Sequence, residues 1–105
     1  MSVKKQFNSF EELIESSELP LLVDFYAPWC GPCQIMAKIL EQVSAKVQDQ
    51  AQVVKINTDT YPALASQYKI SALPTLVIFK GGQPVDRIEG VIPTDKLYDR
   101  LATWL

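Results

Sequence analysis

The sequence of 105 residues contains no histidine and only two cysteines. Without histidine, the chain cannot form the Ser-His or Cys-His pair of many nucleophilic enzymes, nor a metal site that needs imidazole. Two cysteines are too few for the disulfide framework of a small secreted domain. They are also too few for a four-cysteine zinc or iron–sulfur site within one chain. These shortages exclude several classes of enzyme and metalloprotein.

Net charge and long apolar segments are also scarce. Ten basic and twelve acidic side chains leave a net charge of −2, which gives no electrostatic reason to expect binding to nucleic acid or to a membrane surface. The longest uncharged run, residues 25–37, is too short to cross a membrane and is interrupted by proline and glycine. The first eight residues match neither a signal peptide nor a transit peptide, so a reducing cytoplasm is the expected location.

What is present is the composition of one soluble domain. Hydrophobic residues make up 48% of the chain and charged residues 21%, as in ordinary globular proteins. A length near 100 residues is enough for one core, and no repeat or linker divides the sequence. We therefore expect a single monomeric domain over residues 1–105.

Glycines and prolines separate the predicted helices from the predicted strands. Ser9 and Glu12 form a capping box before a short helix that Pro20 ends. The apolar run 21–26 predicts a strand that is covered on both faces. A long amphipathic helix follows. Its predicted apolar face consists of Ile35, Met36, Ile39, Leu40, Val43 and Val47.

The second half of the chain predicts three more strands and two more helices. Strands are expected at 52–57, 75–80 and 85–89, with a glycine hairpin turn before the last, edge-like strand. A short helix is expected at 61–68. Thr94 and Asp95 should cap a final helix that carries Leu97, Leu101, Trp104 and Leu105. Strand–helix–strand connections imply parallel pairing and the hairpin implies antiparallel pairing, so the fold class is α/β with a mixed central sheet.

The two cysteines stand three residues apart, where the buried strand meets the long helix. Side chains at positions i and i+3 of a first helical turn lie on one face, close to disulfide range. The helix N-terminus favours a thiolate on Cys30, which should attack a partner disulfide. Cys33 lies one turn further in and should resolve the mixed disulfide. Gly31 and Pro32 add no charge between them, which favours a reducing pair.

Other uses of a Cys-x-x-Cys pair stay open on this reasoning. Half of a metal site would need carboxylates or a second chain to supply the remaining ligands. Two inert core cysteines would conflict with an exposed Gly-Pro turn between them. A c-type haem would need histidine after the second cysteine, where this chain has Gln34.

The run from Val23 to Cys33, VDFYAPWCGPC, resembles the active-site signature of the thioredoxin family. Residues 54–59, residues 73–76 and Gly90 match the family in order and spacing, so the resemblance covers nearly the whole chain. It implies the thioredoxin fold, which is a three-layer α/β/α arrangement with four helices around a mixed five-stranded sheet in the order 1-3-2-4-5. The first strand would lie near residues 3–7.

The resemblance also implies a function and partners. The protein would be a protein-disulfide reductase with no cofactor beyond the Cys30–Cys33 disulfide and no metal. A thioredoxin reductase that uses NADPH or ferredoxin would recharge it. Residues 72–75 and 86–90 look most like the y-type thioredoxins of plastids and cyanobacteria, which favours the ferredoxin route and peroxiredoxins among the targets. An isomerase or oxidant, a structural subunit and a metal-binding dimer are the rival classes.

Four further residues are expected to support the cysteines. Asp24 lies in an apolar strand and is interpreted as the proton acceptor for Cys33, unless it points to solvent. Lys55 would lie near Asp24 and tune it, unless it is an outward-facing strand lysine. The resemblance implies a cis Leu73–Pro74 peptide packed against the cysteines, with the Leu73 backbone free to pair with a bound peptide.

An apolar contact patch is expected beside Cys30. It would consist of Trp29, Leu73, Val91 and Ile92, with Gly90 allowing close approach of the last loop. Such a patch is typical of a docking surface for partner proteins rather than of a deep pocket for a small molecule.

Overall fold

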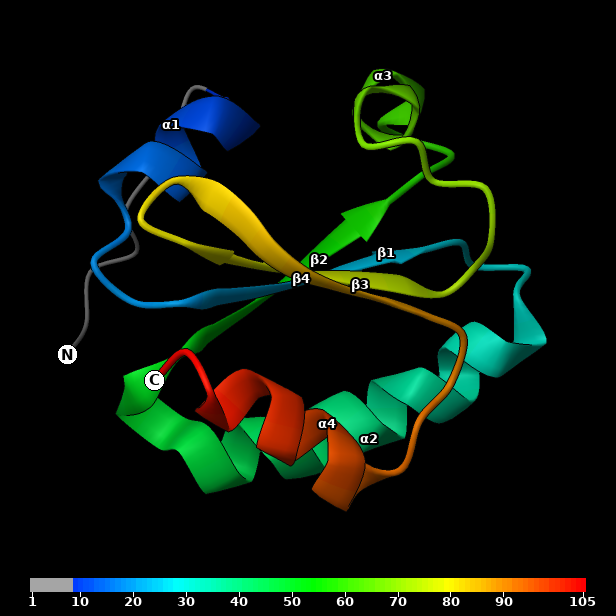
Figure 1. Cartoon of the computed structure of the whole chain (residues 1–105). Coiled ribbons are helices and arrows are strands. Elements are labelled where there is room, and N and C mark those ends of the chain that lie inside the picture. The colour runs from blue at the N-terminus through cyan, green and yellow to red at the C-terminus, as the bar shows by residue number, and fades with distance from the viewer. Residues whose placement is uncertain (1–8) are drawn as a thin grey trace, which may run out of the picture.

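A mixed four-stranded sheet lies between two layers of helices in the computed structural model, which describes residues 9–105 (Figure 1). In chain order the elements are α1 (Phe10–Ser16), β1 (Leu21–Tyr26), α2 (Gly31–Val47), the 3₁₀ turn η1 (Gln48–Gln50), β2 (Gln52–Asn57), α3 (Pro62–Gln67), β3 (Thr75–Lys80), β4 (Gln83–Glu89) and α4 (Thr94–Ala102). Helices α1 and α3 cover one face of the sheet, and α2 and α4 cover the other (Figure 1).

The strand order is β2-β1-β3-β4. Strand β1 pairs parallel to β2 and antiparallel to β3, and β3 pairs antiparallel to β4. The predicted order 1-3-2-4-5 agrees with this arrangement when its first strand is left aside. That strand was expected at residues 3–7, which lie outside the described residues. The thioredoxin fold is therefore confirmed, with four of the five expected strands in view.

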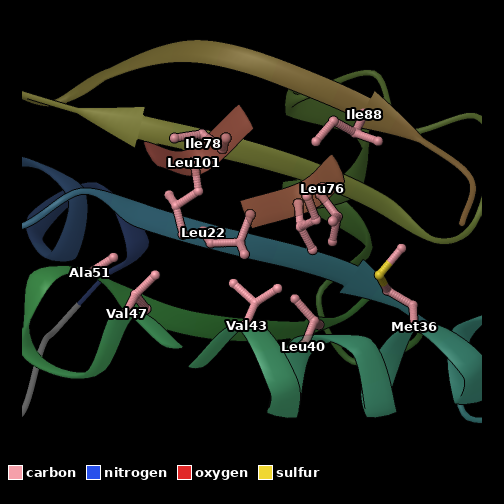
Figure 2. Packing of buried hydrophobic residues seen from close by; sticks show 11 residues of the cluster. Leu22, Met36, Leu40, Val43, Val47, Ala51, Leu76, Ile78, Ile88 and Leu101 are labelled. Carbon is pink, nitrogen blue, oxygen red and sulfur yellow. The ribbon is translucent and has the colours of Figure 1, made fainter. Parts of the chain in front are cut away.

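Alternation along the strands divides the core in two. Leu22 and its neighbours on β3 and β4 face α2 and α4, whereas Val23 and Phe25 face α1 and α3. Figure 2 shows the first cluster, in which the sheet residues point toward the apolar side of α2. Apart from Ala51, the buried residues of this cluster are Leu22, Met36, Leu40, Val43, Val47, Leu76, Ile78, Ile88, Leu97 and Leu101. Burying each large apolar side chain favours folding by roughly 1.5–3 kcal/mol.

Three details of the predicted helices are wrong. Ile35 is 57% exposed, because it lies about 100° around the helix from Met36, which begins the buried stripe. Helix α4 ends at Ala102, so Trp104 and Leu105 lie beyond it. Pro93, without a side-chain hydrogen bond, occupies the N-cap position of α4. The Thr94 hydroxyl instead bonds the side-chain oxygen of Gln42 on α2, which joins the two helices.

Strand β4 is the edge strand, as predicted, and an ion pair fastens it to α4. The Arg100 guanidinium donates from Nε and Nη2 to the two carboxylate oxygens of Asp86, at 2.7 and 2.6 Å. These hydrogen bonds hold the pKa of the Asp86 carboxyl below its ordinary value. Within residues 9–105, no helix has both the length and the apolar character needed to cross a membrane.

Candidate active site

Cys30 occupies the N-cap position of α2, four residues after β1 ends. Its backbone is extended, and Pro32 lies in the first turn, where a missing N–H costs nothing. Cys30 and Cys33 form a disulfide, with their Cα atoms 5.3 Å apart. The Cys33 N–H donates to the Cys30 Sγ at 3.2 Å. The start of α2 therefore offers a hydrogen-bond donor and the positive end of the helix dipole to the first sulfur.

The two cysteines differ in access to the surroundings rather than in burial. Each is only 5% exposed, so the place of Cys33 one turn further into the helix does not make it the more buried of the two. Cys30, however, lines a surface pocket of about 550 Å³, and Cys33 is not among the residues that line it. A partner that occupies this pocket meets Cys30 first.

Asp24 is completely buried, and neither of its carboxylate oxygens has a hydrogen-bond partner. The interpretation that Asp24 points to solvent is therefore wrong. Burial raises the pKa of the Asp24 carboxyl from 3.8 to about 6, and the positive charge of Lys55 opposes this rise. Asp24 stands two residues after Leu22 in β1, so the two side chains lie on the same face of the sheet, which is the face that α2 covers.

Lys55 is the direct neighbour of Asp24 in the parallel β1–β2 pairing. Its side chain is exposed, and its Nζ lies 4.9 Å from the centre of the Tyr26 ring. The ammonium thus makes a cation–π contact at the surface while its charge still acts on Asp24. Both expectations for Lys55 hold in part: the residue faces outward, and it influences Asp24 electrostatically.

Two distant segments converge on the disulfide. The Leu73–Pro74 peptide is cis, as the resemblance implies, and Leu73 packs against the cluster that contains both cysteines. The Gly90 N–H donates to the Pro74 carbonyl at 2.9 Å. Gly90 has a φ of +86°, a conformation that favours glycine, so this residue type suits the close connection. The β4–α4 loop is thereby held against the cis-proline loop.

The pocket combines predicted residues with residues that the sequence did not indicate. Trp29 is 72% exposed, and its Nε1–H donates to a carboxylate oxygen of Asp59 at 3.0 Å. Five predicted residues line the pocket, namely Trp29, Cys30, Gly31, Pro32 and Leu73. The lining residues that were missed are Thr58, Ala65, Ile70 and Ser71. Only Thr58 lies in a segment that matched the family.

The residues of the expected contact patch lie in different surroundings. Val91 is 40% exposed, but it is not among the residues that line the pocket. Ile92 is half-buried and packs against the core cluster under α2 and α4. The apolar side chains of the β4–α4 loop alternate between core and solvent, which local sequence did not reveal.

A disulfide at a helix N-terminus, beside a cis-proline loop and open to a surface pocket, defines a thiol–disulfide oxidoreductase of the thioredoxin fold. The chain belongs to the thioredoxin family, whose family model, described as thioredoxin, matches residues 1–103. As a family member with this paired site it is a disulfide reductase. Among residues 9–105, no cluster of His, Cys, Asp and Glu could hold a metal ion.

Relatives of known name agree with this assignment. The chain is 58% identical to a thioredoxin-like protein of Synechocystis, over the full length of both chains. It is 53% identical to the chloroplastic thioredoxin Y of Oryza sativa, with 97% of this chain matched to 61% of that protein. The oxidised mitochondrial thioredoxin 3 of Saccharomyces cerevisiae has a similar structure, with a TM-score of 0.82, 32% identity and coverage of 90% of this chain and 86% of that one.

The buried carboxyl of Asp24 predicts an unusual dependence of stability on pH. The native pKa is raised to about 6, so between pH 4 and 6 the native state holds a proton that the unfolded state has released. Between pH 4 and 6 the free energy of unfolding should therefore fall by about 2 kcal/mol because of Asp24, out of about 3 kcal/mol over the whole titration of this group. Urea unfolding of the oxidised protein should show this decline, and Asp24→Asn should lack it.

Asp86→Asn is a matched control for this measurement. The native pKa of Asp86 is lowered, so its ionised form stabilises the fold above pH 4, and this variant should lose stability at pH 7. Parallel curves for the wild type and Asp24→Asn between pH 4 and 6 would contradict the raised pKa.

Proposed function

We propose that Cys30 is the attacking nucleophile and Cys33 the resolving thiol when this protein reduces disulfides in target proteins. The observation that carries the assignment is that Cys30 lines the pocket at the N-terminus of α2 while Cys33 does not. A partner sulfur can therefore approach Cys30 without rearrangement of the fold, and a thiolate there lies at the positive end of the helix dipole.

The reaction proceeds by two exchanges. The Cys30 thiolate attacks one sulfur of the target disulfide, the Cys30–target bond forms, and the other target sulfur leaves as a thiolate. The Cys33 thiolate then attacks the Cys30 sulfur, the Cys30–Cys33 bond forms, and the second target thiolate leaves. The target gains two electrons and this protein loses two. The pair itself is the redox group, so no additional cofactor takes part.

Asp24 is proposed as the proton acceptor that converts Cys33 to its thiolate in the second step. Its support is a buried carboxyl without hydrogen bonds, on the side of the sheet that faces α2, with a pKa of about 6. A base with a pKa near neutrality is well matched to a thiol at physiological pH. Lys55 is proposed to tune this base, because its charge opposes the rise in the pKa of Asp24.

Target proteins are proposed to dock beside Cys30 as extended segments. The surface would consist of Trp29, Gly31, Pro32, Leu73, Pro74, Gly90 and Val91. Trp29, Gly31, Pro32 and Leu73 support this proposal because they line the same pocket as Cys30. The hydrogen bond between Gly90 and Pro74 holds the β4–α4 loop beside them. The backbone of Leu73 would pair with the target segment in the manner of an added strand.

The partners are proposed from the relatives. The 53% identity to the chloroplastic thioredoxin Y of rice supports a y-type assignment, with recharging by a ferredoxin-dependent thioredoxin reductase and peroxiredoxins among the targets. We further propose that the protein acts as a monomer in the cytoplasm, where the environment is reducing. A reducing compartment keeps such a dithiol available.

Replacing the resolving cysteine should trap the reaction halfway. With dithiothreitol as electron source, the wild type should reduce a protein disulfide repeatedly, whereas Cys33→Ser should stop as a covalent mixed disulfide and lose at least about 100-fold in turnover. Mass spectrometry without reductant would detect the complex. Cys30→Ser should neither turn over nor form it, and full activity of Cys33→Ser would contradict the assigned roles.

The pH profile of resolution tests Asp24 and Lys55 together. A base with a pKa of about 6 becomes ionised between pH 5 and 7, so its contribution to the resolution rate should rise about tenfold over that range. Stopped-flow decay of a preformed mixed disulfide should show this rise in the wild type and not in Asp24→Asn.

Loss of the Lys55 charge should move the same inflection to higher pH in Lys55→Met, because that charge lowers the pKa of Asp24. The exposed Lys80, at the end of β3, provides the matched control Lys80→Met, which should leave the profile in place. An unchanged resolution rate in Asp24→Asn across neutral pH would exclude the base, and an unchanged inflection in Lys55→Met would exclude the tuning.

The choice of electron donor can be tested directly. The oxidised protein would be incubated in parallel with an NADPH-dependent and a ferredoxin-dependent thioredoxin reductase, each with its own donor system, and thiol formation followed. The proposal expects reduction at least about tenfold faster with the ferredoxin-dependent enzyme. Faster reduction by the NADPH-dependent enzyme would overturn this part of the proposal.

A further inference from the structure

Arg87 connects the edge strand β4 to the end of α3. Its Nη1 donates to the Tyr68 carbonyl at 2.6 Å and its Nη2 to the Lys69 carbonyl at 2.7 Å. Both carbonyls follow directly after α3, where helix carbonyls have no partners within the helix. A guanidinium at this end binds both of the carbonyls that follow the helix and opposes the negative end of the helix dipole.

Helix α3 is six residues long, none of them is buried, and its N-cap residue makes no side-chain hydrogen bond. Leu64, Tyr68 and Ile70 are partly buried against the core cluster under α1 and α3, which is the other attachment of its end. The chain then turns through Lys69, which has a φ of +55°, a conformation that is unfavourable for a residue other than glycine. Packing of the Tyr68 ring against Phe10 and Phe79 holds one side of the turn. The two bonds from Arg87 hold its backbone.

The segment that Arg87 holds continues straight into the pocket wall. Ile70 follows Lys69, and its N–H donates to the Ala65 carbonyl at 2.8 Å. Ile70, Ser71 and Ala65 all line the pocket beside Cys30. The position of this wall relative to the nucleophile therefore depends on the end of α3, which has its most direct polar attachment at Arg87.

Arg87 is itself held from the opposite face of the sheet. Its N–H donates to the Asp86 carboxylate at 2.8 Å, and Arg100 of α4 donates both to Asp86 and, at 3.2 Å, to the Arg87 carbonyl. Val77, the partner of Arg87 on β3, belongs to the cluster under α1 and α3, so the Arg87 side chain extends toward α3. Helix α4 therefore anchors the backbone of Arg87, from which the side chain extends to the end of α3.

We propose that Arg87 is a positioning residue for protein substrates. It holds Ile70 and Ser71 at the distance from Cys30 that a bound target segment requires. Arg87 does not touch the reacting sulfurs. Its loss should affect recognition of a target that fills the pocket and leave the intrinsic reactivity of Cys30 intact. The inference rests on the proposed docking of targets beside Cys30.

The test compares a large and a small disulfide. Arg87→Met should lower the second-order rate constant of the reduced protein with a folded protein disulfide by about 5- to 10-fold. Its rate constant with 2-hydroxyethyl disulfide, which is too small to span the pocket, should stay within about twofold of the wild type. Arg87→Lys should recover part of the loss, because a single ammonium can reach one of the two carbonyls.

Lys80→Met is the matched control. It removes an exposed positive charge from the end of β3, the strand that pairs with β4, and Lys80 is not among the residues that line the pocket. Its two rate constants should both stay within about twofold of the wild type. Hydrogen exchange adds a local measurement: the Ile70 amide should exchange at least about 10-fold faster in Arg87→Met, whereas the buried Leu76 amide on β3 should not change.

The outcomes are distinct. A selective loss with the protein disulfide, together with faster exchange at Ile70, supports the proposal. An equal loss with both disulfides, or no loss with either, overturns it. If the wild type itself reduces the protein disulfide no faster than 2-hydroxyethyl disulfide, the proposed docking fails and this inference fails with it. A wild type that prefers the protein substrate, beside an Arg87→Met variant with the same preference, overturns the role of Arg87 alone.

Discussion

The packing of α2 against the sheet is the interaction on which the active site depends. Met36, Leu40 and Val43 are buried against Leu22 of β1, and this contact fixes where the first turn of the helix lies. Because only four residues separate β1 from α2, the N-terminus of the helix is held at the end of a central strand. The hydrophobic core thus places the N-terminus of α2 beside Cys30, where the Cys33 N–H donates to the Cys30 sulfur. This placement favours a thiolate on that sulfur.

The same core carries an electrostatic cost. A carboxyl without hydrogen bonds has been buried at Asp24, where an apolar residue would stabilise the fold more. Burial gives that carboxyl a pKa close to neutrality, which suits proton transfer to and from a thiol. The positive charge of Lys55, on the neighbouring strand, opposes this rise in the pKa of Asp24. The Lys55 ammonium remains at the surface over the Tyr26 ring. Stability is given up at the residue that we propose as the base, in a chain that has no histidine.

Polar contacts between segments that are distant in sequence also hold the pocket wall. Gly90 binds the carbonyl of Pro74, Asp59 binds the Trp29 ring, and Arg87 binds the end of α3. These contacts add to the packing of Ile70 against the core cluster under α1 and α3. Core packing therefore places Cys30, and polar contacts together with core packing place the surface beside it.

The sequence by itself determined most of the elements and the place of the two cysteines. Hydrophobic period and chain-breaking residues act locally, so β1, β2 and β3 were predicted at their observed bounds and the two cysteines at a helix start. The resemblance added the sheet order and the cis Leu73–Pro74 peptide. Only the tertiary structure decided that Ile35 faces solvent, that Ile92 packs against the core, and that α3 and the segment after it complete the pocket. Those outcomes depend on contacts between residues far apart along the chain, and no local pattern in a single sequence specifies them.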